Sequence, residues 1–143
     1  MIWLAAAAMM MAGQEIDHLP ADCAQASNTL EINACATLDV QREQLRLDRY
    51  FAAAVARVQG EGDDGAEAAA WLRASQPAWK AYADIACGAV YEHWSGGSIR
   101  GVMYLGCMKE LTRERTHAIW RDFLTYADST PPILPEPVGP AAE

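Results

Sequence analysis

Residues 71–87 read WLRASQPAWKAYADIAC, and this stretch decides the fold. Its larger side chains recur at steps of three and four residues, which is the period of an α-helix and not the alternation of a strand. We therefore expect one helical face to pack into the core, with Trp79 and Tyr82 as structural core residues rather than a ligand platform. The members of that face are Trp71, Ser75, Trp79, Tyr82 and Ala86.

Two other residues of this stretch have expected structural roles. Pro77 has no backbone N–H, so we expect the helix to kink near Arg73, whose carbonyl loses its donor. Asp84 is expected to pair locally or with an arginine of another helix. A structural role for this carboxylate is favoured over a catalytic one.

Another helix is expected earlier in the chain. Asn28-Thr29-Leu30-Glu31 has the pattern of an N-cap followed by a capping-box glutamate, and the helix runs to about Gln59. The glycines within residues 60–65 interrupt the helical pattern. Asp64 is then expected to cap the next helix, which reaches about Tyr91. The two helices form an antiparallel hairpin.

The C-terminal part of the chain predicts one more helix and a tail. The helix is expected from near Ser98 to near Tyr126. Five of the seven prolines follow Ser129, so we expect residues 128–143 to be a Pro-rich disordered tail. The expected fold class is all-α: a three-helix antiparallel bundle, in which residues 14–127 form one domain stapled by two disulfides.

The first thirteen residues have the pattern of a signal peptide. Residues 2–12 are uncharged and apolar, too short to span a membrane, and end at the small residues Ala12 and Gly13. No Lys or Arg precedes this run. We expect a periplasmic or secreted protein. No stable membrane anchor is expected after processing, because Cys23 follows Asp22, where an acylation site would have a small residue.

The charge of the chain bounds its partners. Nineteen acidic residues outnumber eleven basic ones, which gives a formal net charge of -8. Such a surface repels nucleic acid and anionic lipid, so no nucleic-acid partner is expected. It would help to capture a cationic protein, mainly by raising the association rate. The alternative interpretation is that the acidity only keeps the protein soluble.

Four cysteines in an exported chain indicate two disulfides. No Cys-x-x-Cys is present, which argues against a thioredoxin-like redox site and a zinc ribbon. The hairpin places Cys35 and Cys87 at the same end, and geometry permits all three pairings of the four cysteines. We favour Cys23–Cys35 and Cys87–Cys107, because each joins a loop to a neighbouring helix.

The sequence offers no motif for catalysis, a metal or a cofactor. His18, His93 and His117 are scattered and form neither a His-x-x-x-His pair nor a His-Glu-x-x-His motif. Nucleophile-elbow, P-loop and dinucleotide-binding glycine motifs are absent as well. We therefore expect a protein that is not an enzyme, with no metal and no cofactor.

Residues 91–98, YEHWSGGS, are the segment best suited to recognition, because they mix aromatic, hydroxyl, carboxylate and glycine groups. A bridge between Cys87 and Cys107 would close this loop at its base and preorganise it. The alternative is that the two large aromatics fold inward and the glycines only turn the chain. The candidate binding residues are Tyr91, Glu92, His93, Trp94, Ser95 and Ser98.

Several motifs occur in an order that resembles the lysozyme-inhibitor LprI N-terminal-type domain family, over about residues 20 to 120. Either of the two longer motifs would be weak alone, and together they are fairly specific. The motifs are Asp22-Cys23, Glu31 to Cys35, Gln76-x-x-Trp79-x-x-Tyr82-x-Asp84-x-x-Cys87, Gly97-Ser98 to Met103-Tyr104-x-x-Cys107, Thr112 and Arg115.

The resemblance implies a secreted or periplasmic helical domain with the local disulfide pairs favoured above. It also implies an extracytoplasmic binding protein that inhibits lysozyme. From the charge of the chain and the composition of the loop, we expect inhibition by insertion of His93, Trp94 and Ser95 into the cleft of a cationic wall-degrading enzyme. The chain departs from the family in two respects: it lacks the acylation site of the lipoprotein namesake, and Pro77 interrupts a stretch that is usually helical. The alternative function is a structural or interaction module of the envelope with no inhibitory activity.

Overall fold

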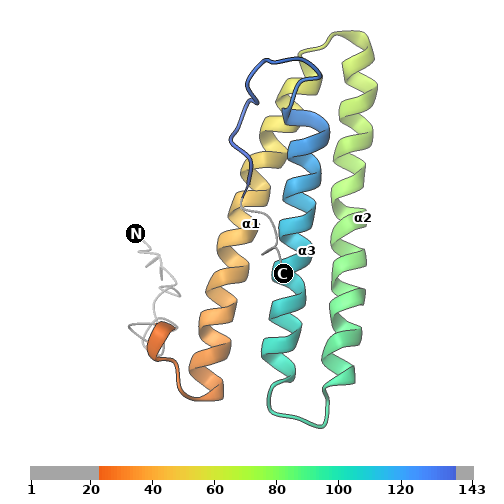
Figure 1. Ribbon diagram of the computed structural model, residues 1–143. Coiled ribbons are helices and arrows are strands. Elements are labelled where there is room, and N and C mark those ends of the chain that lie inside the picture. Colours follow the sequence, from red (N-terminus) through yellow and green to blue (C-terminus); the bar gives the residue numbers. More distant parts are fainter. Residues whose placement is uncertain (1–22, 138–143) are drawn as a thin grey trace, which may run out of the picture.

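The computed structural model describes residues 23–137, and the predicted signal peptide and His18 lie outside this range. Within it the chain is helical and contains no strand (Figure 1). Each of the three long helices runs antiparallel to the one before it, and the expected all-α fold is confirmed. The elements are the short 3-10 turn η1 (Cys23–Gln25), α1 (Thr29–Gln59), α2 (Asp63–His93), α3 (Arg100–Ile119) and the π-helical turn η2 (Trp120–Leu124).

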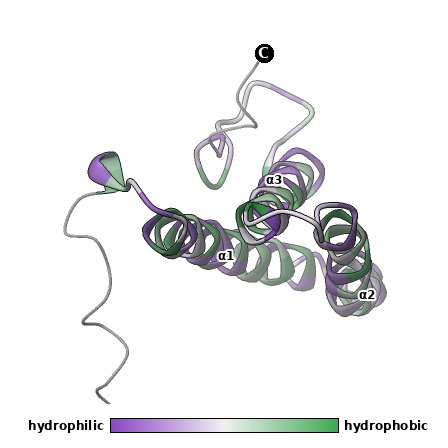
Figure 2. Ribbon diagram, turned by 90° about the horizontal axis from the view of Figure 1, so that it is seen from below, coloured by the Kyte–Doolittle hydropathy of each residue, from purple (hydrophilic) through white to green (hydrophobic). Residues whose placement is uncertain are grey.

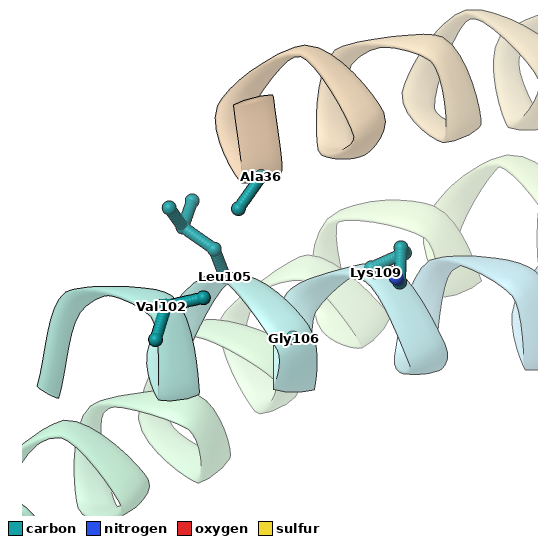
Figure 3. Close-up of a pocket in the computed structure, with 5 residues that line it drawn as sticks. All are labelled: Ala36, Val102, Leu105, Gly106 and Lys109. Atoms are coloured by element: carbon teal, nitrogen blue, oxygen red, sulfur yellow. The ribbon is translucent and has the colours of Figure 1, made fainter. Parts of the chain in front are cut away.

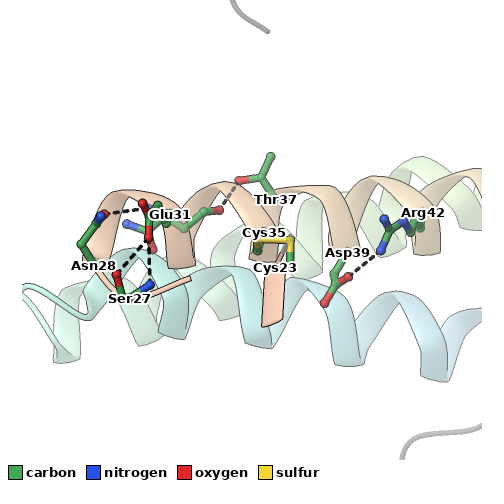
Figure 4. Close-up of a disulfide and its surroundings, with 9 residues drawn as sticks. Cys23, Ser27, Asn28, Glu31, Cys35, Thr37, Asp39 and Arg42 are labelled. Carbon is green, nitrogen blue, oxygen red and sulfur yellow. Dashed lines mark hydrogen bonds and ion pairs between the residues drawn. A yellow bond between two sulfur atoms is a disulfide. The ribbon is translucent and has the colours of Figure 1, made fainter. Parts of the chain in front are cut away.

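The start of α1 is capped as its sequence predicts. The Asn28 side chain accepts a hydrogen bond from the Glu31 N–H at 3.0 Å, and the Glu31 carboxylate accepts one from the Ser27 N–H at 2.8 Å (Figure 4). The Ser27 hydrogen bond is the main cause that lowers the pKa of Glu31. Because the ionised form is the one stabilised, this contribution to folding is present at neutral pH and is lost as the pH falls through that lowered pKa.

The turn between α1 and α2 depends on two glycines. Gly62 has a φ of 85°, a conformation that residues with a Cβ rarely adopt. A Cβ on Gly65 would lie 2.0 Å from the carbonyl oxygen of Val58, so only glycine lets α2 start this close to α1. The prediction that Asp64 caps α2 is wrong. The helix begins directly after Gly62, and Asp64 lies inside its first turn, where its charge complements the helix dipole.

Helix α2 continues through Pro77 and reaches His93. Its buried face is made of small side chains rather than the aromatic face that we expected. Tyr82 is 59% exposed, so the prediction that it packs in the core is wrong, whereas Trp79 is half-buried and contacts core residues. Because most side chains on this face are small, α2 can approach α1 and α3 closely, and the close approach excludes water from the face. The buried residues of α2 are Gly65, Ala69, Leu72, Ala83 and Cys87.

Helix α3 lies beside both other helices (Figures 1 and 2). The buried core residues lie along its length. A larger apolar cluster fills the half of the bundle near the α1–α2 turn, with Leu47, Tyr50, Ala54, Leu72, Ile119 and Leu124 at its centre. A smaller cluster surrounds Ala83, Cys87 and Met108. Trp79 packs against both clusters and joins them into one core.

Two arginines of α3 make the polar contacts with its neighbours. The Nε of Arg113 donates to the buried carboxylate of Glu43 on α1 at 3.0 Å. The other oxygen of Glu43 accepts from Arg46 at 2.7 Å. On the opposite side, Arg115 donates to Ser75 at 2.6 Å and to Gln76 at 3.2 Å, both on α2. Burial lowers the pKa of the Arg115 guanidinium.

The segment after η2 is ordered as far as Pro137. The Tyr50 hydroxyl donates to the Pro135 carbonyl at 2.7 Å, and the Trp120 indole N–H donates to the Leu134 carbonyl at 2.9 Å. The Leu134 side chain packs against the larger core cluster. The prediction of disorder is therefore wrong for residues 128–137, because long-range hydrogen bonds and one apolar anchor hold this Pro-rich chain. Residues 138–143 lie outside the described range.

Replacing Arg113 with alanine tests the α1–α3 ion pair. The change leaves the buried Glu43 carboxylate with Arg46 alone, and we expect the free energy of unfolding to fall by about 3 kcal/mol. Urea titration of the oxidised protein measures this. Arg42→Ala, which removes the exposed pair with Asp39, is the control and should cost less than about 1 kcal/mol. Equal losses in the two variants would contradict the assignment.

Truncation tests the order of the C-terminal segment. A chain ending at Asp128 loses the contacts of Leu134 and Pro135, and we expect the free energy of unfolding to fall by about 2 kcal/mol. A chain ending at Pro137 keeps those contacts and should be more stable than the chain ending at Asp128. Denaturant titration of the three proteins makes the comparison, and equal stability of all three would refute the docking of this segment.

Candidate functional site

Both disulfides brace the same end of the bundle. Cys23–Cys35 joins η1 to the first part of α1, and Cys87–Cys107 joins the last part of α2 to α3. Figure 4 shows the first bridge beside the capping residues of α1. The two favoured pairings are confirmed. The end of the bundle that carries the α2–α3 connection is therefore cross-linked, whereas the opposite end holds the α1–α2 turn (Figure 1).

The α2–α3 connection is shorter than its sequence predicts. Helix α2 extends to His93, so Tyr91, Glu92 and His93 lie in its last turn, while Trp94, Ser95 and Ser98 belong to the connection itself. Backbone hydrogen bonds from Trp94 to Val90, from Ser95 to Glu92 and from Gly97 to Trp94 close successive turns. We call residues 92–99 the tip loop, which is compact because its backbone is largely bonded to itself.

The tip loop presents its polar and aromatic groups to solvent. The side chains of Glu92, His93, Ser95 and Ser98 are exposed, and Trp94 is 37% exposed. The His93 and Trp94 rings meet edge to face with their centroids 5.6 Å apart. The predicted alternative, in which the large aromatics fold inward, therefore does not hold for Trp94.

Tyr91 has a different place from the other five candidate residues. It is half-buried, its ring meets that of Tyr104 edge to face at 6.3 Å, and the Arg100 guanidinium lies 4.9 Å from its ring centroid. Tyr91 thus supports the base of the tip loop, close to the Cys87–Cys107 bridge. Its ring is half-buried, so its role is to hold the loop rather than to contact a partner.

The residues singled out in the middle of α2 lie outside the tip loop and differ in their environments. Asp84 forms an ion pair with Lys80 one turn away and not with an arginine of another helix. The sequence identified Gln76 and Arg115 only as members of the family motifs. In the structure Arg115 donates a hydrogen bond to Gln76, and this bond joins α3 to α2. Trp71 and Tyr82, which we expected on the packed face, are instead exposed on the outer side of α2 together with Ile85.

The described residues offer little for chemistry. A pocket lies between α1 and α3, lined by apolar side chains and one lysine (Figure 3). Its lining residues are Ala36, Val102, Leu105, Gly106 and Lys109. Within residues 23–137 no group of three His, Cys, Asp or Glu side chains is placed to hold a metal ion. None of the helices described there is long and apolar enough to cross a membrane.

Comparison with known proteins gives two findings. Residues 21–119 match the family described as "Lysozyme inhibitor LprI". An uncharacterized protein of Rhizobium meliloti (strain 1021) is 34% identical over 102 residues, which covers 66% of this chain and 73% of that protein. No solved structure matches the chain.

The family match spans η1, all three long helices, both disulfides and the tip loop. The matched part therefore includes each element that the structure describes at the exposed end of the bundle. This chain belongs to the lysozyme inhibitor LprI family.

Proposed function

We propose that this protein is a periplasmic or secreted inhibitor of lysozyme that inserts its tip loop into the substrate cleft. The observation that carries the proposal is an exposed, disulfide-braced loop in a chain of the LprI lysozyme inhibitor family. Two disulfides fit a protein that folds in an oxidising compartment outside the cytoplasm. Such a protein would not be an enzyme, and it acts by occupying the active site of one.

Charge supports this choice of partner. Lysozymes are basic proteins that cleave glycosidic bonds between two carboxyl groups in a cleft. A net charge of -8 steers the inhibitor toward a basic protein and raises the association rate. The encounter is therefore expected to slow as the salt concentration rises.

The groups at the tip suit a cleft that contains carboxylates. The His93 imidazole, the Trp94 indole N–H and the Ser95 hydroxyl can each donate a hydrogen bond to a carboxylate oxygen. Their exposure means that they lose water rather than internal partners when they bind. The flat Trp94 ring is the natural anchor, because tryptophan contributes heavily to the binding energy of protein interfaces.

The bracing of the tip loop reduces the entropy lost on binding. Cys87–Cys107 closes a segment with a sequence separation of 20 residues, and the turns within the loop are already hydrogen-bonded. The Tyr91–Tyr104 contact and the Arg100 guanidinium hold the base of the loop on the core side. The tip is thus presented as a rigid projection at the end of α2 and α3 (Figure 1).

Substitution of Trp94 tests the proposed contact. We expect purified protein to inhibit lysozyme-catalysed lysis of cell walls, and Trp94→Ala to raise the inhibitory concentration about tenfold or more. Trp71→Ala is the matched control, since Trp71 is an exposed tryptophan on the outer side of α2 and should leave inhibition unchanged. A native protein that fails to inhibit any of several lysozymes at tens of micromolar would remove the proposal and leave an interaction module.

Removal of one disulfide tests the bracing. The double variant Cys87→Ala/Cys107→Ala frees the base of the tip loop, so we expect weaker inhibition at temperatures where the variant is still folded. The matched control is Cys23→Ala/Cys35→Ala, which opens the bridge on α1 at the same end of the bundle. Inhibition assays and thermal unfolding are measured on both variants, and equal inhibition by the two would argue against the role of the brace.

A further inference from the structure

The outer side of α2 carries a row of apolar side chains that no element of the described structure covers. Trp71 is 71% exposed, Tyr82 59% and Ile85 76%. The other seam positions facing the same way hold small residues: Ala74, Ala78 and Ala81 lie between Trp71 and Ile85, and Gly88 follows Ile85. We call this row the outer stripe. It lies on the opposite side of α2 from the buried residues Ala69, Leu72, Ala83 and Cys87.

The outer stripe has the spacing of a coiled-coil seam. Trp71, Ala78 and Ile85 are seven residues apart, and Ala74, Ala81 and Gly88 each follow three residues later. The stripe covers about 27 Å along one helix. Scattered exposed apolar residues are normal on a protein surface, but a continuous row of about 500 Å² is the size at which patches are commonly functional.

We propose that the outer stripe is a self-association surface, on which α2 of a second copy of this chain packs antiparallel. In an antiparallel pair, the first seam position of one helix faces the second seam position of the other. Trp71 then lies against Gly88 of the partner subunit, and Ile85 against Ala74 of the partner subunit. Ala78 meets Ala81 of the partner subunit at the centre. A large side chain thus meets a small one in every outer layer, and the small central residues let the helices approach closely.

A parallel pair would not fit in this way. Its layers would place Trp71 against the partner's Trp71 and Ile85 against the partner's Ile85, while alanines and glycines would face each other across gaps. Such alternating overpacked and empty layers are unfavourable. The pattern of side-chain sizes therefore selects the antiparallel orientation and a two-fold symmetric dimer.

The ends of the outer stripe limit the strength of the dimer. Glu67 and Glu92 lie on the same side of α2. Glu67 is one helical turn before Trp71, and Glu92 is one helical turn after Gly88. In the antiparallel register Glu67 approaches Glu92 of the partner subunit, so like charges meet at both ends. The interface would bury about 1,000 Å² in total, which is at the lower end for specific association. The dimer is therefore expected at micromolar concentrations, and it tightens when this repulsion is removed.

This interface is separate from the proposed inhibitory contact. An antiparallel pair of α2 helices places the two tip loops at opposite ends of the dimer, so His93, Trp94 and Ser95 of each loop remain free. Loss of the dimer should leave lysozyme inhibition unchanged, and loss of inhibition should leave the dimer intact.

Sedimentation velocity of the exported, oxidised protein from low to high micromolar concentration tests the interface. We expect a concentration-dependent dimer that Ile85→Glu abolishes and that Glu67→Gln/Glu92→Gln strengthens several-fold. Leu45→Glu is the control, because Leu45 is a 71% exposed leucine on α1, away from the outer stripe. It should dimerise like the native protein. A native chain that stays monomeric throughout, or a control that is disrupted as strongly as Ile85→Glu, would overturn the proposal.

A size exchange tests the orientation. A Cβ added at Gly88 would have no neighbour within 4 Å beyond the adjacent backbone of its own helix, so we expect Gly88→Leu to leave the monomer folded. In the antiparallel dimer this leucine collides with Trp71 of the partner subunit, and we expect the dimer to weaken at least tenfold. In the double variant Gly88→Leu/Trp71→Ala, the leucine at position 88 faces an alanine at position 71 of the partner subunit. A large side chain again meets a small one, so we expect most of the association to recover. Strengthening by Gly88→Leu alone would show a parallel pair and refute the antiparallel one.

Discussion

The bundle depends on the position of α3 between two partners, and two side chains of α3 define that position. Arg113 and Arg115 are two residues apart, which places them about 200° from each other around the helix. One reaches the buried Glu43 of α1 and the other reaches Ser75 and Gln76 of α2. An apolar core permits a helix to slide or rotate at modest cost, whereas each of these polar contacts is satisfied in one register only. Once α3 is in that register, Cys87 and Cys107 face each other and the tip loop projects from the end of the bundle.

The two ends of the bundle are stabilised by different means, and this difference bears on function. At the far end from the tip loop, Arg57 donates to the carbonyls of Phe123 and Thr125, and the Pro-rich segment covers Trp120. That end is held by hydrogen bonds and apolar packing. At the tip end, where a partner would bind, two covalent bridges hold the described residues together. Covalent bridges inside the bundle can make this end rigid while the tip loop beside them stays exposed.

Much of the fold could be predicted because its determinants are local. The N-cap of α1, the break at the glycines and the three helical segments each depend on neighbours in sequence, and the cysteine pairing followed from the motif pattern of the family. The buried face of α2 could not be predicted. Its aromatic face and its face of small side chains both repeat with the period of a helix, and only packing against α1 and α3 decides that the face of small side chains is buried. The order of residues 128–137 depends on Tyr50 and Trp120, which are distant in sequence. At the candidate site, composition identified the tip loop, but the exposure of Trp94 and the burial of Tyr91 depend on where α2 ends.

Hydrogen exchange of the protein, alone and with saturating lysozyme, tests the central claim most directly. Amide exchange reports which part of the chain a partner covers without any substitution in the chain. The account predicts that bound lysozyme slows exchange in the tip loop, residues 92–99, and leaves the rates along residues 71–85 and 131–137 unchanged. Protection along either of those segments, with the tip loop exchanging as fast as in the free protein, would contradict it.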